Sequence, residues 1–363
     1  MLKINHLELF AGIGGFRQAM ELLASDYNFT SHCVGFSEID PYAVRSYKSN
    51  FSDVETKEIG DIIAFNEDPK NITSLPDFDL LTGGFPCQSF SMMGKQKGFL
   101  DKRGNVFFEI IKILEIKKPK FVLLENVRNL TTHNKGETIK IVLSSLKEAG
   151  YKYIHWDVFD TNDFGLAQRR NRVYIFASRE KLDNNFAFSK NEIISVFKTI
   201  SKNANLERQK DVLDILEKEV DKSFYLSEII KPTILADGSA SFKSKSEINC
   251  LIAKPLTATM VKMHRACQDN YYSIDFINSP NPYDYLSQKF SKEELKEKEI
   301  RKLTPREAYL LQGFSETFFN NAKLAGVSNH QLYKQAGNAA SVNTIYAILY
   351  YLFIYKKINE GLV

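Results

Sequence analysis

Cys87 is the residue of this chain best suited to nucleophilic chemistry. It stands in the segment GGFPCQSFS at residues 83–91, where two glycines and a proline shape a loop after an apolar run. A thiolate held in such a loop is a strong nucleophile. A lone cysteine is more often a small buried residue, but the Pro-Cys-Gln context at a strand end favours the nucleophile. Gln88 and Ser91, which follow Cys87, are candidates for substrate contact.

A carboxyl group and two guanidinium groups could serve the same cleft. Glu125 ends another apolar run, where a partly buried carboxylic acid could donate a proton. Arg170 and Arg172 are alternate residues of an extended segment before a further strand, so we expect both to face one site. There they could hold an oxygen of a base or a phosphate. Taken alone, Glu125 could equally cap a helix, and the arginines could form a surface basic patch.

A glycine-rich turn, Phe10-Ala11-Gly12-Ile13-Gly14-Gly15, follows a predicted strand and opens a predicted helix. Glycines let a ligand approach the backbone, and the first turn of a helix offers free N–H groups. The spacing departs from the dinucleotide fingerprint GxGxxG because Arg17 stands at the third glycine. Nicotinamide or flavin binding is therefore disfavoured.

Two carboxylates extend this pattern. Glu38 lies at the end of the next predicted strand, where an acid can accept hydrogen bonds from ribose hydroxyls. Asp61 follows Gly60 after another short strand. Together with the turn, they indicate an adenosine-type ligand without a pyrophosphate. The alternative is a structural tight turn with carboxylates in solvent.

The elements that position these residues alternate through residue 180. Short apolar runs at 7–10, 33–36, 78–81, 121–124 and 173–176 predict strands, and the amphipathic stretches 105–117 and 137–149 predict helices. This alternation predicts an α/β fold with an open, mostly parallel sheet and helices on both faces. Ligands bind outside the carboxyl ends of such strands, where each cluster above except the basic one is found.

From 181 to 300 the chain changes character. Charged stretches at 207–220 and 291–302 predict helices around a Ser-, Tyr- and Asn-rich middle, which favours a smaller, irregular unit. The end returns to helix: Thr304 is a good cap, followed by Pro305 at the first helical position. The apolar run 345–355 is shorter than the ~20 residues of a membrane span. We expect it to pack on the open face of the sheet.

Composition is that of a globular protein, with 44% hydrophobic and 25% charged residues and a net charge of +4 over 363 residues. This charge permits nucleic-acid binding without requiring it. A local basic excess lies at Lys243, Lys245, Lys254, Lys262 and Arg265 against Glu247 alone, which suits a phosphate backbone or a solvated face. Four scattered cysteines, no secretory signal in the first residues and no metal-ligand spacing predict a cytoplasmic protein without a metal.

In combination these motifs resemble those of the DNA cytosine-5 methyltransferases, particularly the bacterial restriction–modification type. The matching segments occur in the family's order: LFAGIGGF at 9–16, SEID at 37–40, GDI at 60–62, GGFPCQSFS at 83–91, GFLDKRGNVFFEI at 98–110, ENV at 125–127, QRRNRVYIFA at 168–177, RKLTPREAYLLQGF at 301–314 and QAGNAASVNT at 335–344. They span nearly the whole chain except the variable stretch 181–300.

The resemblance implies a Rossmann-like S-adenosylmethionine-dependent methyltransferase that methylates carbon 5 of a flipped-out cytosine within a short, specific double-stranded DNA sequence. Cys87 would attack carbon 6, Glu125 would contact and protonate N3, and Arg172 would hold O2 with support from Arg170. It also implies four domain segments: 1–180 for catalysis and cofactor binding, 181–300 for target recognition, 301–330 as hinge, and 331–363 completing the catalytic domain.

By the same resemblance, S-adenosylmethionine would be bound by Phe10, Gly12, Gly14, Glu38, Ile39, Asp61, Ile62 and Asn338. Ile39 departs from an aromatic residue that stacks on adenine in many relatives; it can pack but not stack. Pro255–Thr259 loosely resembles a short element of family recognition regions, and beside it Lys262, His264 and Arg265 are candidates for phosphate or guanine contact.

The expected partner is double-stranded DNA. No association with a membrane is expected, and the protein is expected to act as a monomer. A cognate restriction endonuclease acting separately stays open, as does the target sequence. Two alternatives stay open as well: a relative that methylates transfer RNA, and a catalytically silent DNA-binding relative. The first usually carries a Cys-Phe-Thr tripeptide that this chain lacks, and the second conflicts with the presence of Cys87, Glu125 and Arg172.

Overall fold

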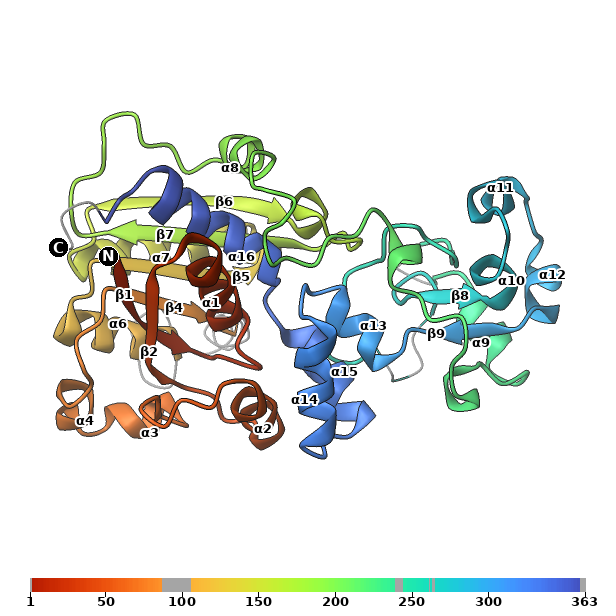
Figure 1. The fold of residues 1–363 in the computed structure, drawn as a ribbon, viewed down its shortest axis with the longest axis horizontal. Helices are drawn as coiled ribbons and strands as arrows, with labels where there is room; N and C mark the ends of the chain where they lie inside the picture. The colour runs from red at the N-terminus through yellow and green to blue at the C-terminus, as the bar shows by residue number, and fades with distance from the viewer. Residues whose placement is uncertain (1, 87–105, 239–243, 261, 263–264, 360–363) are drawn as a thin grey trace. The chain divides into compact units, whose positions relative to one another are not determined.

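The computed structural model describes residues 2–86, 106–238, 244–260, 262 and 265–359, which fall into two compact units (Figure 1). The first unit is formed by the described parts of Met1–Phe164, Asn171–Leu206 and Ala340–Val363. The second is formed by those of Gly165–Arg170 and Glu207–Ala339. Residues 181–206 thus pack with the sheet, because Ile193, Val196 and Phe197 are buried there. The change in composition near 181 does not coincide with a change in packing.

The first unit is built on a seven-stranded sheet of order β3-β2-β1-β4-β5-β7-β6. Its strands are β1 (Lys3–Leu9), β2 (Thr30–Phe36), β3 (Lys57–Glu58), β4 (Leu80–Gly84), β5 (Phe121–Val127), β6 (Tyr153–Asp160) and β7 (Asn171–Ser178). The first five pair in parallel, and β7 pairs antiparallel with both β5 and β6. The predicted mostly parallel α/β sheet is confirmed.

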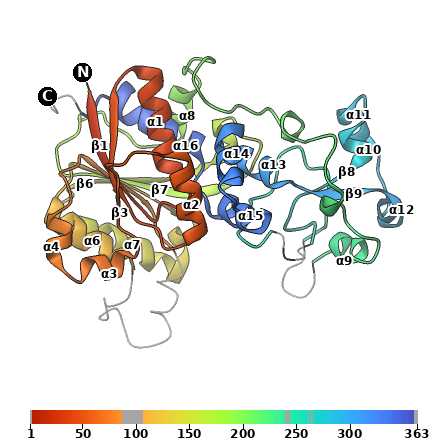
Figure 2. The ribbon, with the colours of Figure 1, turned by 60° about the horizontal axis from the view of Figure 1, so that its bottom comes forward.

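Helices cover both faces of this sheet (Figure 2). On one face lie α3 (Ile62–Asn66), α4 (Pro69–Thr73), α6 (Val106–Lys117) and α7 (Glu137–Glu148), whose apolar residues form one core cluster with β1, β4, β5 and β7. On the other face lie α1 (Gly15–Tyr27), α8 (Lys190–Phe197), α16 (Val342–Leu349) and the π-helical turn η6 (Tyr350–Tyr355). Helix α2 (Pro41–Asn50) links β2 to β3, and the 3-10 turns η1 (Arg128–Thr131), η2 (His133–Gly136) and η3 (Thr161–Phe164) complete the unit.

The apolar end of the chain lies where the sequence predicts. Helix α16 packs against α1, from the opposite end of the chain (Figure 1). Beyond it, Phe353 meets Phe121 of β5 edge to face. Close packing requires Gly15 here, because a Cβ at that position would stand 2.8 Å from the carbonyl oxygen of Ala340. No helix in the described residues is both long and apolar enough to cross a membrane.

The second unit consists of short helices around a two-stranded sheet of β8 (Tyr271–Ser273) and β9 (Ile300–Lys302). Its other elements are η4 (Val212–Asp214), η5 (Lys222–Phe224), α9 (Lys231–Leu235), α10 (Ile274–Ile277), α11 (Pro282–Ser287), α12 (Lys292–Glu297), α13 (Pro305–Leu310), α14 (Glu316–Leu324) and α15 (Asn329–Asn338). The cap at Thr304 forms as predicted: its side chain accepts from Glu307 N–H while the Glu307 carboxylate accepts from Thr304 N–H.

The helix predicted over 207–220 is wrong. This segment is irregular apart from the three-residue turn η4. Polar side chains of the segment bond to backbone groups instead. The Gln209 amide accepts from Ala167 N–H and donates to the Leu310 carbonyl, and the Asp211 carboxylate accepts from Leu213 N–H. Such side-chain bonds compete with a helix. The stretch 291–302 is only partly helical, since α12 ends at Glu297 and β9 follows.

Candidate active site

The predicted chemical residues gather at one edge of the sheet in the first unit. Strands β1 to β5 run parallel, so the segments that follow them emerge at their common carboxyl edge. Strand β7 runs the other way and therefore begins at this edge, with Arg172 in register with Val127. The glycine turn, Glu38, Asp61, Glu125 and Arg172 consequently share it.

Glu125 and Arg172 form an ion pair at the end of β5. The Nε of Arg172 lies 3.0 Å from Oε1 of Glu125, and Glu125 is 9% exposed. The other carboxylate oxygen, Oε2, lies toward Gly84 of β4, where a Cβ would stand only 3.2 Å from it. A glycine at the end of β4 thus leaves room for this carboxyl group. The arrangement presents a held carboxyl group and a guanidinium group side by side.

Asn126 ties the end of β5 to the segment after β4. Its side-chain amide donates to the carbonyl of Phe85 at 2.7 Å, and both residues are buried. Phe85 precedes Cys87 by two residues in the sequence, so the chain enters the predicted nucleophile segment from a fixed point beside Glu125. Cys87, Gln88 and Ser91 themselves lie outside the described residues.

The glycine turn is shaped for close approach. Phe10, Gly12 and Gly14 all have positive φ, of 53°, 56° and 92°. A Cβ on Gly12 would meet nothing within 4 Å, whereas a Cβ on Gly14 would stand 2.4 Å from the ring of Phe51. Gly12 therefore borders open space and Gly14 packs tightly. This is what a backbone that receives a ligand on one side requires.

Glu38 joins the turn after β1 to the turn after β2. Its carboxylate accepts from Gly12 N–H at 2.8 Å through Oε2, and from Ile39 and Asp40 N–H at 2.8 Å through Oε1. The neighbouring Ile39 side chain is 75% exposed. An acid that holds two turns together beside an exposed apolar side chain is suited to a ribose with an attached base.

The side chains of Asp61 and Ile62 differ in their exposure to solvent. Asp61 is exposed and caps α3, accepting from Ile63 N–H at 2.9 Å. Ile62 is 3% exposed and its side chain belongs to the core beneath the sheet. Of the two side chains predicted to border adenine, Asp61 is the accessible one.

Arg170 is not oriented as the alternation argument predicts. It is 2% exposed and belongs to the second unit, where its guanidinium donates to the carbonyls of Leu256 at 2.8 Å and of Gly337 and Ala339 at 3.0 Å. The side chain has this orientation because three buried carbonyls accept hydrogen bonds from its guanidinium group. These contacts differ from the expectation that Arg170 points into one site with Arg172, and we expect Arg170 to hold the backbone of the second unit in place.

Three further predicted residues lie in the second unit. Lys262 is exposed, as a phosphate contact would require. Arg265 is half-buried and donates to the carbonyl of Asp237 at 2.7 Å, so part of its guanidinium serves the fold. Asn338 ends α15 with an exposed side chain.

The sequence matches the family described as C-5 cytosine-specific DNA methylase over residues 4–353. The chain belongs to this family. Curated relatives include the Type II methyltransferase M1.ScrFI of Lactococcus lactis subsp. cremoris, 37% identical over 95% of this chain and 77% of that protein. Another is the Type II methyltransferase M.NgoBI of Neisseria gonorrhoeae, 36% identical over 94% of this chain and 90% of that protein.

Solved structures show the same fold. The Entamoeba histolytica methyltransferase EhMeth and the S. pombe Dnmt2 methyltransferase each align with a TM-score of 0.71 at 22% identity. They cover 97% and 96% of this chain, respectively, and 98% of their own chains. This DNA methylase therefore has the Rossmann-like α/β fold of these solved methyltransferases.

Some residues of the methylase site were not assigned a role from the sequence. Asn126 stands in the ENV motif, but only the sheet register shows that it reaches Phe85. Gly84 adjoins the cysteine motif, and its closeness to Glu125 follows from pairing between β4 and β5. Among the described residues, no group of three His, Cys, Asp or Glu side chains could hold a metal ion.

Proposed function

We propose that this methylase transfers a methyl group from S-adenosylmethionine to carbon 5 of a flipped-out cytosine in a short, specific double-stranded DNA sequence. The observation that carries the proposal is the Glu125–Arg172 pair at the carboxyl edge of the sheet, next to the anchored entry to the Cys87 segment. The glycine turn and Glu38 stand at the same edge. A base and a methyl donor would thereby meet at one end of one sheet.

The cofactor residues suit adenosine and methionine. The open space at Gly12 and the positive φ of Phe10 and Gly14 support a ligand lying against the backbone of the turn. Glu38 would take the ribose hydroxyls, exposed Ile39 would pack on adenine, and Asp61 would accept from its amino group, with Ile62 beneath. S-adenosylmethionine supplies the electrophilic methyl group when bound. The proposed contribution of Asn338 rests on the family motif.

The chemistry proposed for the protein's groups is activation of a poor nucleophile. The Cys87 thiolate forms a bond to carbon 6 of cytosine while Glu125 delivers a proton to N3, so the electron pair of the ring double bond becomes available at carbon 5. Arg172 holds O2. After carbon 5 has taken the methyl group, its proton passes to solvent water, the ring double bond reforms as the bond between sulfur and carbon 6 breaks, Cys87 leaves as the thiolate and N3 returns its proton to Glu125. The ion pair keeps the carboxyl and guanidinium groups in a fixed relation on one edge of the base.

Both reacting faces of cytosine are inaccessible inside a duplex, so the base must leave the helix at a cost of a few kcal/mol. Phosphate contacts would offset that cost, and Lys262 and Arg265 are the candidates in the second unit. Gln88 and Ser91, beside the nucleophile, are proposed to contact the DNA. Within the second unit the backbone of Leu256 is held by Arg170, which donates to its carbonyl, and by Gln168, which accepts from its N–H.

Bisulfite sequencing of genomic DNA from a methylation-free bacterial host that expresses the protein tests the proposal. Methylated cytosine at one short motif is expected with the wild type and absent with Cys87→Ser. The Cys87→Ser protein should still bind S-adenosylmethionine in calorimetry. Stable, soluble wild type that leaves the genome unmethylated would refute DNA methylation, and transfer RNA from the same cells would then be examined.

A further inference from the structure

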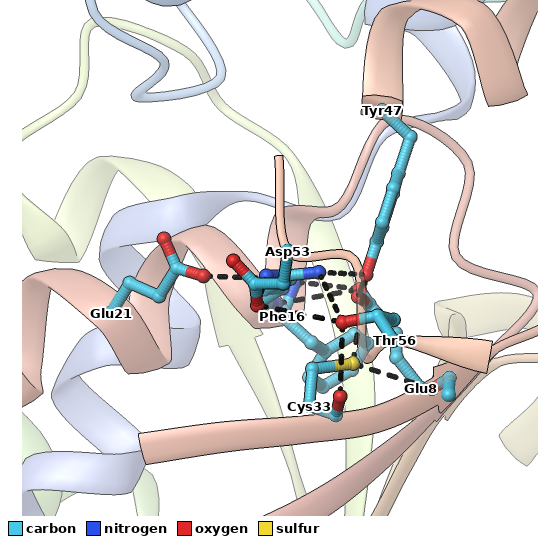
Figure 3. A network of polar contacts seen from close by, with 9 residues as sticks. Glu8, Phe16, Glu21, Cys33, Tyr47, Asp53 and Thr56 are labelled. Carbon is cyan, nitrogen blue, oxygen red and sulfur yellow. Dashed lines mark hydrogen bonds and ion pairs between the residues drawn. The ribbon is translucent and has the colours of Figure 1, made fainter. Parts of the chain in front are cut away.

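A polar cluster lies next to the turns of the proposed cofactor site. It consists of the buried residues Glu8, Arg17, Cys33 and Tyr47, the partly buried Thr56 and the exposed Asp53, and we refer to it as the polar network. Figure 3 shows Glu8, Cys33, Tyr47, Asp53 and Thr56 converging. Glu8 is fully buried and Arg17 is 1% exposed. A charged group is rarely placed inside a protein unless its position serves a purpose, because desolvation costs several kcal/mol.

Glu8 fastens the start of helix α1 to strand β1. Its Oε1 accepts from Phe16 N–H at 3.1 Å and from Arg17 N–H at 3.4 Å, and its Oε2 accepts from the Tyr47 hydroxyl at 3.4 Å. The helix has Gly14 at its N-cap, which has no side chain to satisfy these N–H groups. Glu8 supplies the missing acceptor from the strand before the turn.

The guanidinium group of Arg17 links helix α1 to helix α2 and to the segment 53–56. It donates to the Tyr47 hydroxyl of α2 at 3.3 Å and to Thr56 Oγ1 at 3.4 Å, and it pairs with Asp53. Its carbon Cζ lies 4.4 Å from the centre of the Phe51 ring. On its solvent side, Nε pairs with Glu21 Oε1 at 2.7 Å, where Glu21 is half exposed.

The network encloses the proposed cofactor residues along the chain. The glycine turn lies between Glu8 and Arg17, Glu38 lies between Cys33 and Tyr47, and Asp61 follows Asp53 and Thr56. Contact is also direct, because a Cβ on Gly14 would stand 3.0 Å from the Tyr47 ring. Each turn therefore lies close in the sequence to residues of the network.

We propose that Arg17 and Glu8 are positioning residues for the cofactor, which set the glycine turn and the Glu38 turn at the spacing that adenosine and methionine require. The inference rests on the proposed function and concerns a part of the chain that touches neither substrate directly. It also explains why arginine replaces the third glycine of the dinucleotide fingerprint. The guanidinium group joins α1 to α2 and to the segment 53–56, whereas a glycine at this position would lack these bonds.

Calorimetric titration of S-adenosylmethionine into the purified full chain tests this role. Arg17→Lys keeps the charge but loses the guanidinium fork, and is expected to weaken binding about tenfold or more, as for a lost charge-assisted hydrogen bond. Glu21→Gln is the matched control, since it removes only the solvent-side partner of the same arginine, and should bind as the wild type does. Tyr47→Phe removes one hydroxyl and should weaken binding about threefold.

Steady-state kinetics separate positioning from general damage. With Arg17→Lys, KM for S-adenosylmethionine should rise while kcat at saturating cofactor and KM for DNA stay near the wild-type values. Equal cofactor affinity in folded Arg17→Lys, or a parallel loss in all three constants, would overturn the proposal. If Arg17→Lys does not fold, Tyr47→Phe decides, and wild-type affinity in that variant overturns it. Wild type that binds no S-adenosylmethionine would instead refute the proposed function and, with it, this inference.

Discussion

Arg170→Lys distinguishes an arginine that touches the substrate from one that holds the protein together. The guanidinium of Arg170 satisfies three buried carbonyls at 2.8 to 3.0 Å, and an ammonium group cannot reach all three. Hydrogen bonds to a charged group contribute about 1.5–3 kcal/mol each. Loss of one or two of them should lower the free energy of unfolding by roughly 2–6 kcal/mol, and the melting temperature of a chain of this length by about 3–8 °C.

The assay is thermal and urea unfolding of Arg170→Lys beside Arg169→Lys. Arg169 is the adjacent, exposed arginine, and its replacement should change the free energy of unfolding by less than ~0.5 kcal/mol. Methylation is then measured well below both melting temperatures, where folded Arg170→Lys should retain turnover within about tenfold of the wild type. If Arg170→Lys were as stable as Arg169→Lys yet inactive, the arginine would belong to the reaction and our assignment would be refuted.

Three further outcomes are expected. Glu125→Gln should slow methyl transfer by ~10²–10⁴ in single-turnover assays with cofactor affinity unchanged, since it removes a general acid; an unaltered rate would exclude Glu125 from proton transfer. Burial lowers the pKa of His6 from 6.5 to about 3, so as the pH falls the unfolded chain binds this proton before the folded protein does. His6 should therefore lower the stability of the folded protein by about 1.4 kcal/mol for each pH unit below 6.5. The melting temperature of the wild type should fall relative to that of His6→Phe between pH 7 and 5, and parallel curves would contradict this. Replacing Lys262 and Arg265 together should weaken DNA binding and flatten its salt dependence, which fluorescence anisotropy at several salt concentrations measures; an identical slope would clear both residues.

Local patterns predict the central strands well because those strands are buried on both faces. Runs such as Phe121–Leu124 are wholly apolar, so their burial is visible in the sequence. Strand β6 was not predicted. It lies at the edge of the sheet, and residues such as His155 and Asp157 interrupt its apolar pattern. Position in the sheet, which determines how apolar a strand must be, depends on pairing with distant segments.

The candidate site, too, could be predicted from the sequence only in part. Residue types and strand ends suffice to place Glu38, Asp61 and Glu125 at one edge, since parallel strands share a direction. Alternation alone could not show what Arg170 binds, because its acceptors on Leu256, Gly337 and Ala339 come from segments far away in the chain. The 207–220 segment failed for a similar reason: side-chain hydrogen bonds to distant backbone outweighed the local charged pattern.

The order in which the ribosome makes the chain gives helix α16 a particular consequence. This helix packs on α1, yet it is synthesised after the whole second unit. Translation at ~5–20 residues per second therefore leaves the aromatic face around Phe121 uncovered for many seconds while the second unit emerges. The first unit cannot complete its fold until residues 342–353 have been made, so a nascent chain stalled before Ala340 would expose the surface that Phe353 covers in the folded protein.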